Sequence, residues 1–207
     1  MMKLSSNQVG IVRRLYYREE CSMREVALKL NVSLNAVCHF MRKHDLPRRT
    51  FKEEQHLRFI KKPPTFKISK LTPRLKELQA IGAMLYWGEG YKNAQENSVV
   101  DFANSEPGMI LLFLTFLRKV YNVDEKRLRM YLYCYSDQNI HALKRYWSRL
   151  TGIPQSRFSK PYVRSDFRKD GRKMRYGLLH IRYGDKKLLL EILRLIEYYQ
   201  HKYASVV

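Results

Sequence analysis

Glu89 is the residue of this 207-residue chain whose position points most directly to chemistry. It ends the stretch 78–88, precedes Gly90 and is followed by Lys92. A carboxylate at the end of a helix can hold a divalent cation, and a neighbouring lysine can stabilise developing negative charge. Because a carboxylate is electrostatically unfavourable at a helix C-terminus, its presence favours a metal ligand. The alternative is a buried apolar helix that ends at a glycine.

The stretch that leads to Glu89 reads as a helix with small residues along its length, namely Ala80, Gly82, Ala83 and Gly88. Glycine inside a helix costs about 1 kcal/mol relative to alanine, so its repeated use predicts a close approach of backbones or a functional role. Aligned on the final acid and glycine, residues 82–90 resemble the signature helix of the LAGLIDADG homing endonuclease family. Ala83 and Gly88 match its small positions, and Glu89-Gly90 matches its Asp-Gly pair.

In that family two signature helices pack at a twofold axis, and their terminal acids bind the metals that cut DNA. This chain has one such motif, so the resemblance implies a homodimer formed through the helix 78–90. It also implies that Glu89 is a catalytic residue and metal ligand, with Lys92 and Lys160 as candidate catalytic cations. Mg²⁺ is expected only if the protein is a nuclease, and otherwise no cofactor is expected.

Residues 75–207 are expected to form one domain. The periodicity predicts helices near 78–90, 106–121, 136–152 and 185–200, strands near 98–102 and 127–135, and a hairpin over 157–183 that turns at Asp170-Gly171. With one helix inserted, this order is close to the αββαββα order of a LAGLIDADG domain, whose sheet forms a concave saddle on DNA. The predicted fold class is therefore α+β, a LAGLIDADG-like saddle preceded by a small all-α helix-turn-helix domain.

Alternation over 127–135 predicts a strand with one core face and one outer face. The core face carries Leu128, Met130, Leu132 and Cys134. The outer face is basic and aromatic, with Arg127, Arg129, Tyr131, Tyr133 and Tyr135. Such a face suits a nucleic-acid groove, and Arg129, Tyr131 and Tyr133 are its candidate DNA contacts.

The distal half of the predicted hairpin is strongly basic, with eight Lys and Arg between residues 157 and 175. A two-stranded ribbon of this charge can enter a major groove. The candidate DNA contacts in it are Arg164, Arg168, Lys169, Arg172 and Lys173. The alternative is a solvated loop.

Residues 1–46 are expected to form a helix-turn-helix domain that begins with a helix at 6–20. Ser22 and Glu25 have the spacing of a capping box, and Asn31 suits a left-handed turn between two helices. The pattern resembles the helix-turn-helix of bacterial regulators and resolvase-type recombinases, in which the start of the second helix enters the major groove. The candidate DNA-binding residues are Ser33, Leu34, Asn35, Ala36, His39, Arg42 and Lys43. The alternative is an ordinary helical hairpin with a solvated face.

Residues 47–74 read as a basic linker because they contain four prolines and show no sustained periodicity. The pairs Arg48-Arg49 and Lys61-Lys62 could follow phosphates, as basic arms of DNA-binding domains do. A solvated tether is the alternative.

Composition points to a polyanionic partner. The chain has 40 Lys and Arg against 19 Asp and Glu, a formal net charge of +21, and the excess is spread along its length. Cys21, Cys38 and Cys134 have neither zinc-site spacing nor the pattern of a disulfide framework. With no apolar run near the roughly 18 residues of a membrane span and no signal-peptide core, a cytoplasmic, nucleoid-associated protein without a membrane partner is expected.

Two functions compete most directly. The first is a sequence-specific double-stranded DNA-binding protein, regulator-like, that does not cut. Met84 and Trp87 favour it, because the signature helix usually has glycine and a polar residue there. The second is a Mg²⁺-dependent site-specific endonuclease that acts as a homodimer, which Glu89 and Lys92 favour. RNA binding through stacked tyrosines is a third possibility.

Overall fold

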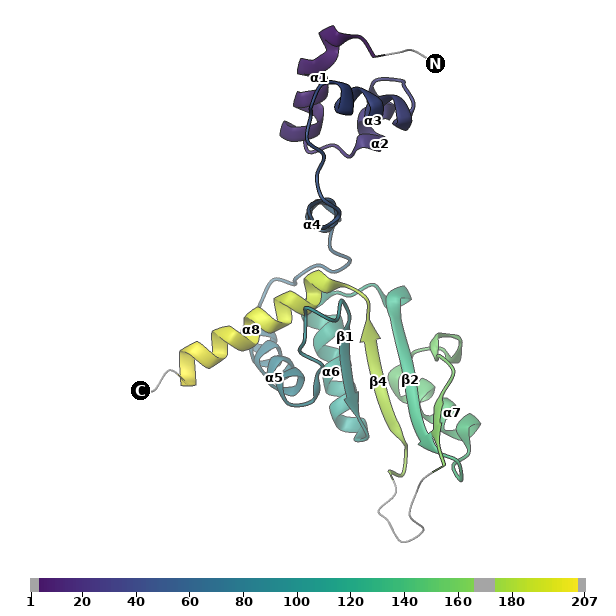
Figure 1. Cartoon of the computed structure of the whole chain (residues 1–207). Helices are drawn as coiled ribbons and strands as arrows, with labels where there is room; N and C mark the ends of the chain where they lie inside the picture. The colour runs from purple at the N-terminus through teal and green to yellow at the C-terminus, as the bar shows by residue number, and fades with distance from the viewer. Residues whose placement is uncertain (1–3, 166–173, 205–207) are drawn as a thin grey trace. The chain divides into compact units, whose positions relative to one another are not determined.

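The computed structural model describes residues 4–165 and 174–204 (Figure 1). Its internal contacts divide the chain into two compact units, Met1–Pro63 and Pro64–Val207. The described part of the first unit is helical, and the second unit is α+β with a four-stranded mixed sheet. The α+β class is therefore confirmed.

The first unit contains a first helix followed by three more. The first helix starts with a 3₁₀ turn at Ser6–Gln8, continues as α1 (Val9–Arg13) and ends in a π-helical turn at Arg14–Arg18. The others are α2 (Met23–Lys29), α3 (Leu34–Lys43) and α4 (Phe51–Lys61). The single helix predicted over 6–20 is thus present, with a π-helical last turn.

The start of α2 and the turn that links it to α3 have the geometry that the sequence predicts. The Ser22 hydroxyl accepts a hydrogen bond from the Glu25 amide at 3.2 Å, and the Glu25 carboxylate accepts one from the Ser22 amide at 2.6 Å. Asn31 has φ of 53°, in the left-handed region that asparagine tolerates. Val26 and Val37 are fully buried between the helices, and Ala27 is nearly so. The start of α2 and the turn between α2 and α3 are therefore built from local signals.

The segment 47–74, expected to be a linker without sustained periodicity, contains the helix α4, and each of its ends packs on one of the two units. Thr50 caps α4 with Glu53, and Lys61 donates to the Glu20 carbonyl at 2.5 Å. The Arg49 side chain is bound within the first unit. Its guanidinium binds Glu54 and the carbonyls of Tyr16 and Cys21, and only 13% of its side chain is exposed.

The second unit packs helices on one face of its sheet, with α6 and α7 behind it in Figure 1. Its helices are α5 (Pro73–Glu89), α6 (Pro107–Tyr121), α7 (Ile140–Thr151) and α8 (Lys186–Ala204). Its strands are β1 (Val100–Asn104), β2 (Leu128–Tyr135), β3 (Tyr162–Arg164) and β4 (Leu178–Tyr183). The strand order is β1-β4-β2-β3, with only the β2–β3 pair parallel.

The hairpin predicted over 157–183 is wrong. β3 pairs in parallel with β2, from Tyr133 opposite Tyr162, whereas β4 pairs with β1 and β2. A parallel pair needs a crossover connection, and α7 supplies it between β2 and β3. The expected turn at Asp170-Gly171 lies outside the described residues.

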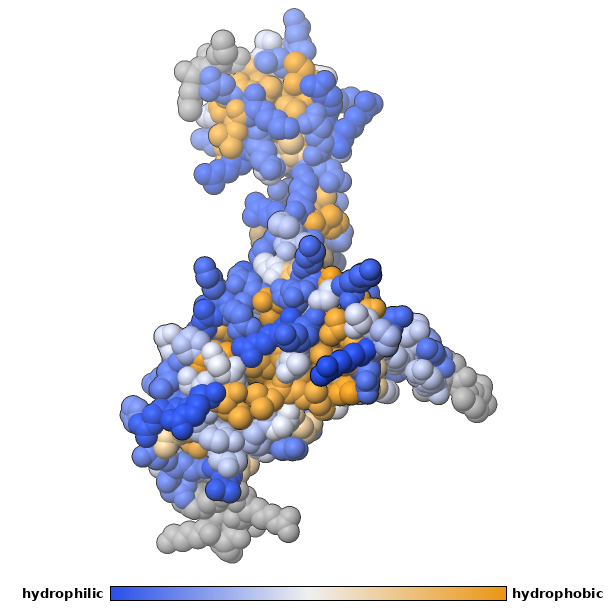
Figure 2. Space-filling view, turned by 180° about the vertical axis from the view of Figure 1, so that it is seen from behind, coloured by the Kyte–Doolittle hydropathy of each residue, from blue (hydrophilic) through white to orange (hydrophobic). Residues whose placement is uncertain are grey.

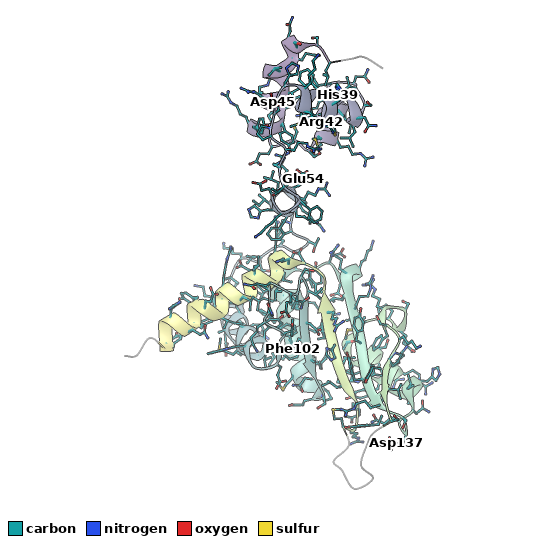
Figure 3. All side chains as sticks on the ribbon, in the orientation of Figure 1. His39, Arg42, Asp45, Glu54, Phe102 and Asp137 are labelled. Atoms are coloured by element: carbon teal, nitrogen blue, oxygen red, sulfur yellow. The ribbon has the colours of Figure 1, made fainter. Side chains whose placement is uncertain are left out.

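The core of the second unit lies between the sheet and its helices. Phe102 of β1 is fully buried and stacks on Phe113 of α6, with ring centroids 4.1 Å apart. Figure 3 labels Phe102 in this layer. The core face of β2 is buried as its alternation predicts, from Leu128 to Cys134. Asn139 caps α7 through its side chain, and the N-cap residue of α6 is Glu106.

Residues 64–72, part of the segment expected to be a linker, pack on the second unit. Asp185 accepts hydrogen bonds from the amide and hydroxyl of Thr65 at 2.8 and 2.7 Å. The same carboxylate accepts from the Lys187 amide at 2.8 Å, so it also caps α8. Burial acts to raise the pKa of Asp185, but the hydrogen bonds from Thr65 and the α8 amides outweigh it, and the pKa lies below its usual value.

We expect Asp185→Asn to reduce the acid sensitivity of the second unit. A carboxyl whose pKa is lower in the folded state stabilises the fold above its unfolded pKa of about 3.9, and this contribution is lost as the pH falls below about 4. Urea unfolding of the wild type should therefore lose more stability between pH 6 and pH 3 than that of the variant. Tryptophan fluorescence follows this unit alone, since Trp87 and Trp147 both lie in it. Equal losses in both proteins would contradict the assignment.

Candidate nucleic-acid interface

The outer face of α3 is the first candidate surface. Val37, Phe40 and Met41 bury the inner face of this helix, which leaves the other side in solvent. The exposed candidates there are Leu34, Asn35, His39, Arg42 and Lys43. Figure 3 labels His39 and Arg42 on this helix. The spacing of Asn35, His39 and Arg42 places them on one side of the helix, where a base edge and phosphates could be reached together.

The remaining two candidates of this unit have structural roles. The Ser33 hydroxyl accepts a hydrogen bond from the Ala36 amide at 3.1 Å, and so caps α3. Ala36 is half-buried and packs against the core of the unit. The exposed candidates of this unit are therefore the five residues named above.

The outer face of the sheet is the second candidate surface. The register sets Arg129 of β2 opposite Arg182 of β4, and Arg182 opposite Asp101 of β1. In the next row Tyr131 lies opposite His180. Farther along β2 come Tyr133, opposite Tyr162 of β3, and Tyr135, opposite Arg164. This open face is therefore basic and aromatic with one carboxylate, as the alternation in β2 predicts.

The tyrosines of the open face pack against their neighbours. The Tyr133 ring lies between His180 and Tyr162, with centroid distances of 4.6 and 5.1 Å. The Arg182 guanidinium covers the Tyr131 ring at 4.3 Å from its centroid. Tyr162 is the most exposed of these aromatics, at 59%. Arg129 is exposed and donates to the carbonyls of Lys126 and Leu128, so its guanidinium is held at the end of β2.

Asp101, His180 and Arg182 were not predicted from the sequence as functional residues, and the structure brings them together. Asp101 binds the Nδ1 atom of His180 at 2.9 Å and the Nε atom of Arg182 at 2.6 Å. The alternation of buried and outer residues could have placed all three on the outer face of the sheet, since buried neighbours flank each of them along β1 and β4. Without the pairing of the two strands, however, nothing in the sequence joins them.

Glu89 and Lys92 lie near the edge of the sheet beside β1. Gly90 forms an isolated bridge with Phe102, and a Cβ atom on Gly90 would lie 2.4 Å from the Tyr86 ring, so this position requires glycine. The Glu89 side chain is exposed. The Lys92 ammonium donates to the carbonyls of Trp87 and Gly90 at 2.7 and 3.2 Å, and therefore closes the C-terminus of α5.

Lys160 is not brought near Glu89 of its own chain. It precedes β3, at the opposite edge of the sheet from β1. Three strand spacings separate these edges, which corresponds to about 14 Å. Within one chain, the structure thus does not bring Lys160 close to Glu89. In the parts of the chain that the structure describes, no group of three or more His, Cys, Asp or Glu side chains is arranged to hold a metal.

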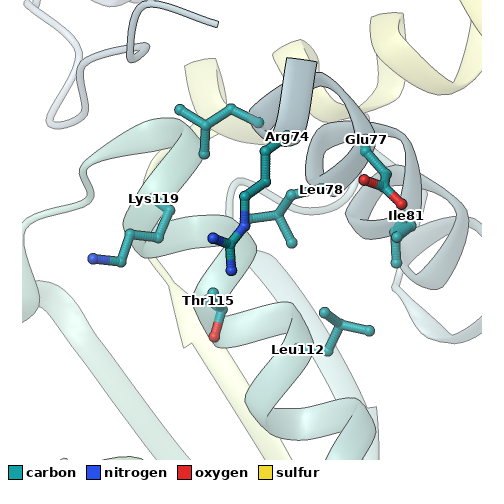
Figure 4. A pocket seen from close by; sticks show the side chains of 8 residues that line it. Arg74, Glu77, Leu78, Ile81, Leu112, Thr115 and Lys119 are labelled. Atoms are coloured by element: carbon teal, nitrogen blue, oxygen red, sulfur yellow. The ribbon is translucent and has the colours of Figure 1, made fainter. Parts of the chain in front are cut away.

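The outer side of α5 is apolar and hollowed on both flanks. One hollow, of about 590 Å³, lies between Leu78 and Ile81 of α5 and Leu112 of α6, with Arg74, Glu77 and Lys119 at its rim (Figure 4). A second, of about 330 Å³, is lined by α5 and α8 through Ala80, Met84, Trp87, Tyr199, Gln200 and Tyr203. Figure 2 shows hydrophobic side chains gathered on this helical side of the second unit.

The small residues of α5 have different surroundings. A Cβ atom on Gly82 would lie 2.2 Å from the ring of Phe116, and Ala83 is fully buried in the core of its own unit. Gly88 has open space around it, and Ala80 lines the second hollow. Part of the pattern that resembles the signature helix thus serves packing of α5 on α6 within the chain.

Four further candidates, Arg168, Lys169, Arg172 and Lys173, lie outside the described residues. Arg164 is exposed at the end of β3. Among the helices of the described residues, none is long and apolar enough to cross a membrane. Comparison of the chain with protein-family models, with curated proteins and with solved structures finds no match.

Proposed function

We propose that the protein is a sequence-specific double-stranded DNA-binding protein that does not cut its target. The observation that carries the proposal is the outer face of α3. A capped helix that follows a left-handed turn at Asn31 presents Asn35, His39, Arg42 and Lys43 to solvent. This is the geometry in which a second helix enters a major groove, with Asn35 able to pair with adenine and the basic residues with phosphate.

The open face of the sheet is proposed as the second DNA contact, on a domain of LAGLIDADG type. Arg129, Arg164 and Arg182 supply positive charge there, and Tyr162 supplies an exposed aromatic ring. An α+β fold with an open basic sheet face supports this assignment. A concave saddle would let the face follow the duplex, and the net charge of +21 suits contact at two places on one polyanion.

The outer side of α5 is proposed to pair with its twofold mate in a homodimer. Ile81, Met84 and Trp87 are exposed on this side, at 39%, 37% and 41%, and Ala80 and Gly88 leave room for close approach. In a twofold interface the same surface serves both subunits, so the basic and acidic groups at the rim of the first hollow can pair across the axis. A homodimer would present two copies of α3 to one palindromic site.

A Mg²⁺-dependent site-specific endonuclease, acting as that homodimer, is the second candidate function. Glu89 favours it, because this exposed carboxylate ends the same helix that is proposed to lie at the twofold axis. Mg²⁺ needs only one or two carboxylates together with substrate phosphates, so Glu89 and its twofold mate fit as ligands. The bound ion would supply a Lewis acid for phosphodiester hydrolysis. The contacts of Lys92 to backbone carbonyls assign it to closing α5, which weakens its role as a catalytic cation.

The binding test begins with selection of the preferred duplex from a random pool by the full-length protein. We expect Asn35→Ala to weaken binding to the selected duplex by about 10- to 100-fold, because a bidentate base contact contributes about 1–3 kcal/mol of discrimination. Binding to an unrelated duplex should change little. The matched variant Lys43→Ala should instead weaken both duplexes alike and lower the salt slope by about 1. Equal affinity of the wild-type protein for all duplexes would contradict the proposal of sequence-specific binding.

The selected duplex also decides between binding and cleavage. Wild type and Glu89→Gln are incubated with it in Mg²⁺ or Mn²⁺. Tight binding by both proteins, with no cut in either, is the expected result. Double-strand cuts by the wild type that vanish in Glu89→Gln would establish the endonuclease instead.

A further inference from the structure

Asp101 is an unusual residue for a surface that meets DNA. Among the residues of the four described strands it is the only carboxylate, and its side chain lies on the open face. Only 13% of this side chain is exposed, and each carboxylate oxygen accepts a hydrogen bond. A carboxylate repels phosphate, so its place in this row requires a role other than backbone attraction.

The contacts of Asp101 fix what Arg182 and His180 can offer to a ligand. Arg182 uses Nε towards Asp101 and also forms a hydrogen bond with the Tyr131 side chain, and the remaining N–H groups of its two terminal nitrogens form a donor edge. His180 meets a carboxylate, which only accepts, so its Nδ1 carries a proton, and Nε2 is an acceptor whenever it carries none. The open face of the sheet therefore presents the donor edge of Arg182 close to the Nε2 atom of His180.

Both side chains are also held from a second direction. The Arg182 guanidinium lies over the Tyr131 ring, and the His180 ring lies over Tyr133. Burial acts to lower the pKa of Arg182, but Asp101 and Tyr131 outweigh it and raise the pKa, so the guanidinium stays charged. Arg182 and His180 keep 34% and 17% of their side chains exposed. Side chains held in this way lose little conformational entropy when they bind.

We infer that Arg182 and His180 form a base-reading site in the open face, and that Asp101 is the residue that positions them. The ligand is the major-groove edge of a guanine, whose N7 and O6 atoms accept from the two terminal nitrogens of Arg182. His180 Nε2 faces the amino group of a neighbouring cytosine or adenine. The inference rests on the proposed binding of double-stranded DNA and adds to α3 a second place where sequence is read.

The test uses the full-length protein and the duplex selected from a random pool. Each guanine of that duplex is replaced in turn by 7-deazaguanine, which removes the N7 acceptor and leaves Watson–Crick pairing intact. For the wild type, replacement of one guanine that α3 does not contact should lower the affinity of the protein for the duplex by about tenfold or more. In Arg182→Gln the same replacement should cost nothing. In Asp101→Asn, whose side chain has the same shape, the cost should fall to threefold or less.

Arg164→Gln is the matched control, because Arg164 is exposed on the same face but lies on β3. In that variant the cost of 7-deazaguanine should stay as in the wild type. Unfolding followed by Trp87 and Trp147 fluorescence checks that each variant keeps its fold, since both tryptophans lie in the second unit.

Two results would overturn the inference while leaving DNA binding in place. One is that no guanine depends on Arg182. The other is that Asp101→Asn tightens binding to selected and unrelated duplexes equally, which would make Asp101 a simple counter-charge. If the wild type binds no duplex at all, the proposed function fails as well.

Discussion

Gly82→Ala is expected to destabilise the second unit by about 3 kcal/mol, since overpacking of a dense core costs this much when the neighbours cannot move. The new Cβ atom would lie 2.2–2.6 Å from three ring atoms of Phe116. Phe116 is fully buried, and its ring is held by Phe113 and Tyr121, with centroids 5.6 and 5.2 Å away. The ring therefore has no space into which it can turn, and α5 must shift away from α6.

The measurement is urea unfolding followed by tryptophan fluorescence, with Gly88→Ala as the matched control. Both glycines lie in α5, but a Cβ atom on Gly88 meets nothing within 4 Å. At a protein concentration low enough to keep the chain monomeric, Gly88→Ala should leave stability unchanged or raise it by about 0.5 kcal/mol, because alanine is the better helix former. Similar losses in the two variants would show that the glycines act through the flexibility of the helix rather than through contact with Phe116. Sedimentation of Gly88→Ala separately reports on the proposed dimer.

Arg49→Met is expected to destabilise the first unit by about 3 kcal/mol. The guanidinium donates to the Glu54 carboxylate at 3.1 Å and to the Tyr16 carbonyl at 3.1 Å, and it also donates to the Cys21 carbonyl. It lies over the Tyr16 ring, 3.9 Å from the centroid. Methionine keeps most of the apolar stem but leaves a half-buried carboxylate and two carbonyls without their donor, and this is the larger part of the cost.

The first unit has no tryptophan, so its stability is followed by amide hydrogen exchange over residues 4–61. Arg48→Met is the control, since the neighbouring Arg48 is exposed. It should change exchange little, and neither variant should move the tryptophan transition of the second unit. Arg49→Lys should not rescue stability, because an ammonium group cannot reach all three acceptors in the fork geometry. Equal exchange in Arg48→Met and Arg49→Met would contradict the role of Arg49.

Several features of the fold could be predicted because their signals are local. The capping box at Ser22 and Glu25 and the left-handed Asn31 each depend on residues within one turn, and the helix-turn-helix geometry follows from them. Alternation along β2 fixes which side chains enter the core, whatever strand lies beside it. The face of α3 that carries Asn35 and His39 is likewise set by helical periodicity alone.

Other features depend on contacts between distant parts of the chain. The hairpin over 157–183 was predicted from a turn dipeptide, but β3 pairs with β2 and not with β4. Arg49 resembles a phosphate contact in sequence because its acceptors on Tyr16 and Cys21 lie 33 and 28 residues away. No local pattern could have shown that this side chain is already occupied.

The sequence by itself determined the charge, the two helices on either side of the Asn31 turn and the pattern of buried and outer residues. Only the tertiary structure decided which side chains meet. Asp101 lies 79 residues from His180 and 81 from Arg182, and the pairing of β1 with β4 joins them. The strand order, with β1 and β3 at its two ends, places Glu89 near one edge of the sheet and Lys160 at the other. Strand order depends on the packing of the whole core, and the free energy of that packing is not contained in any single segment.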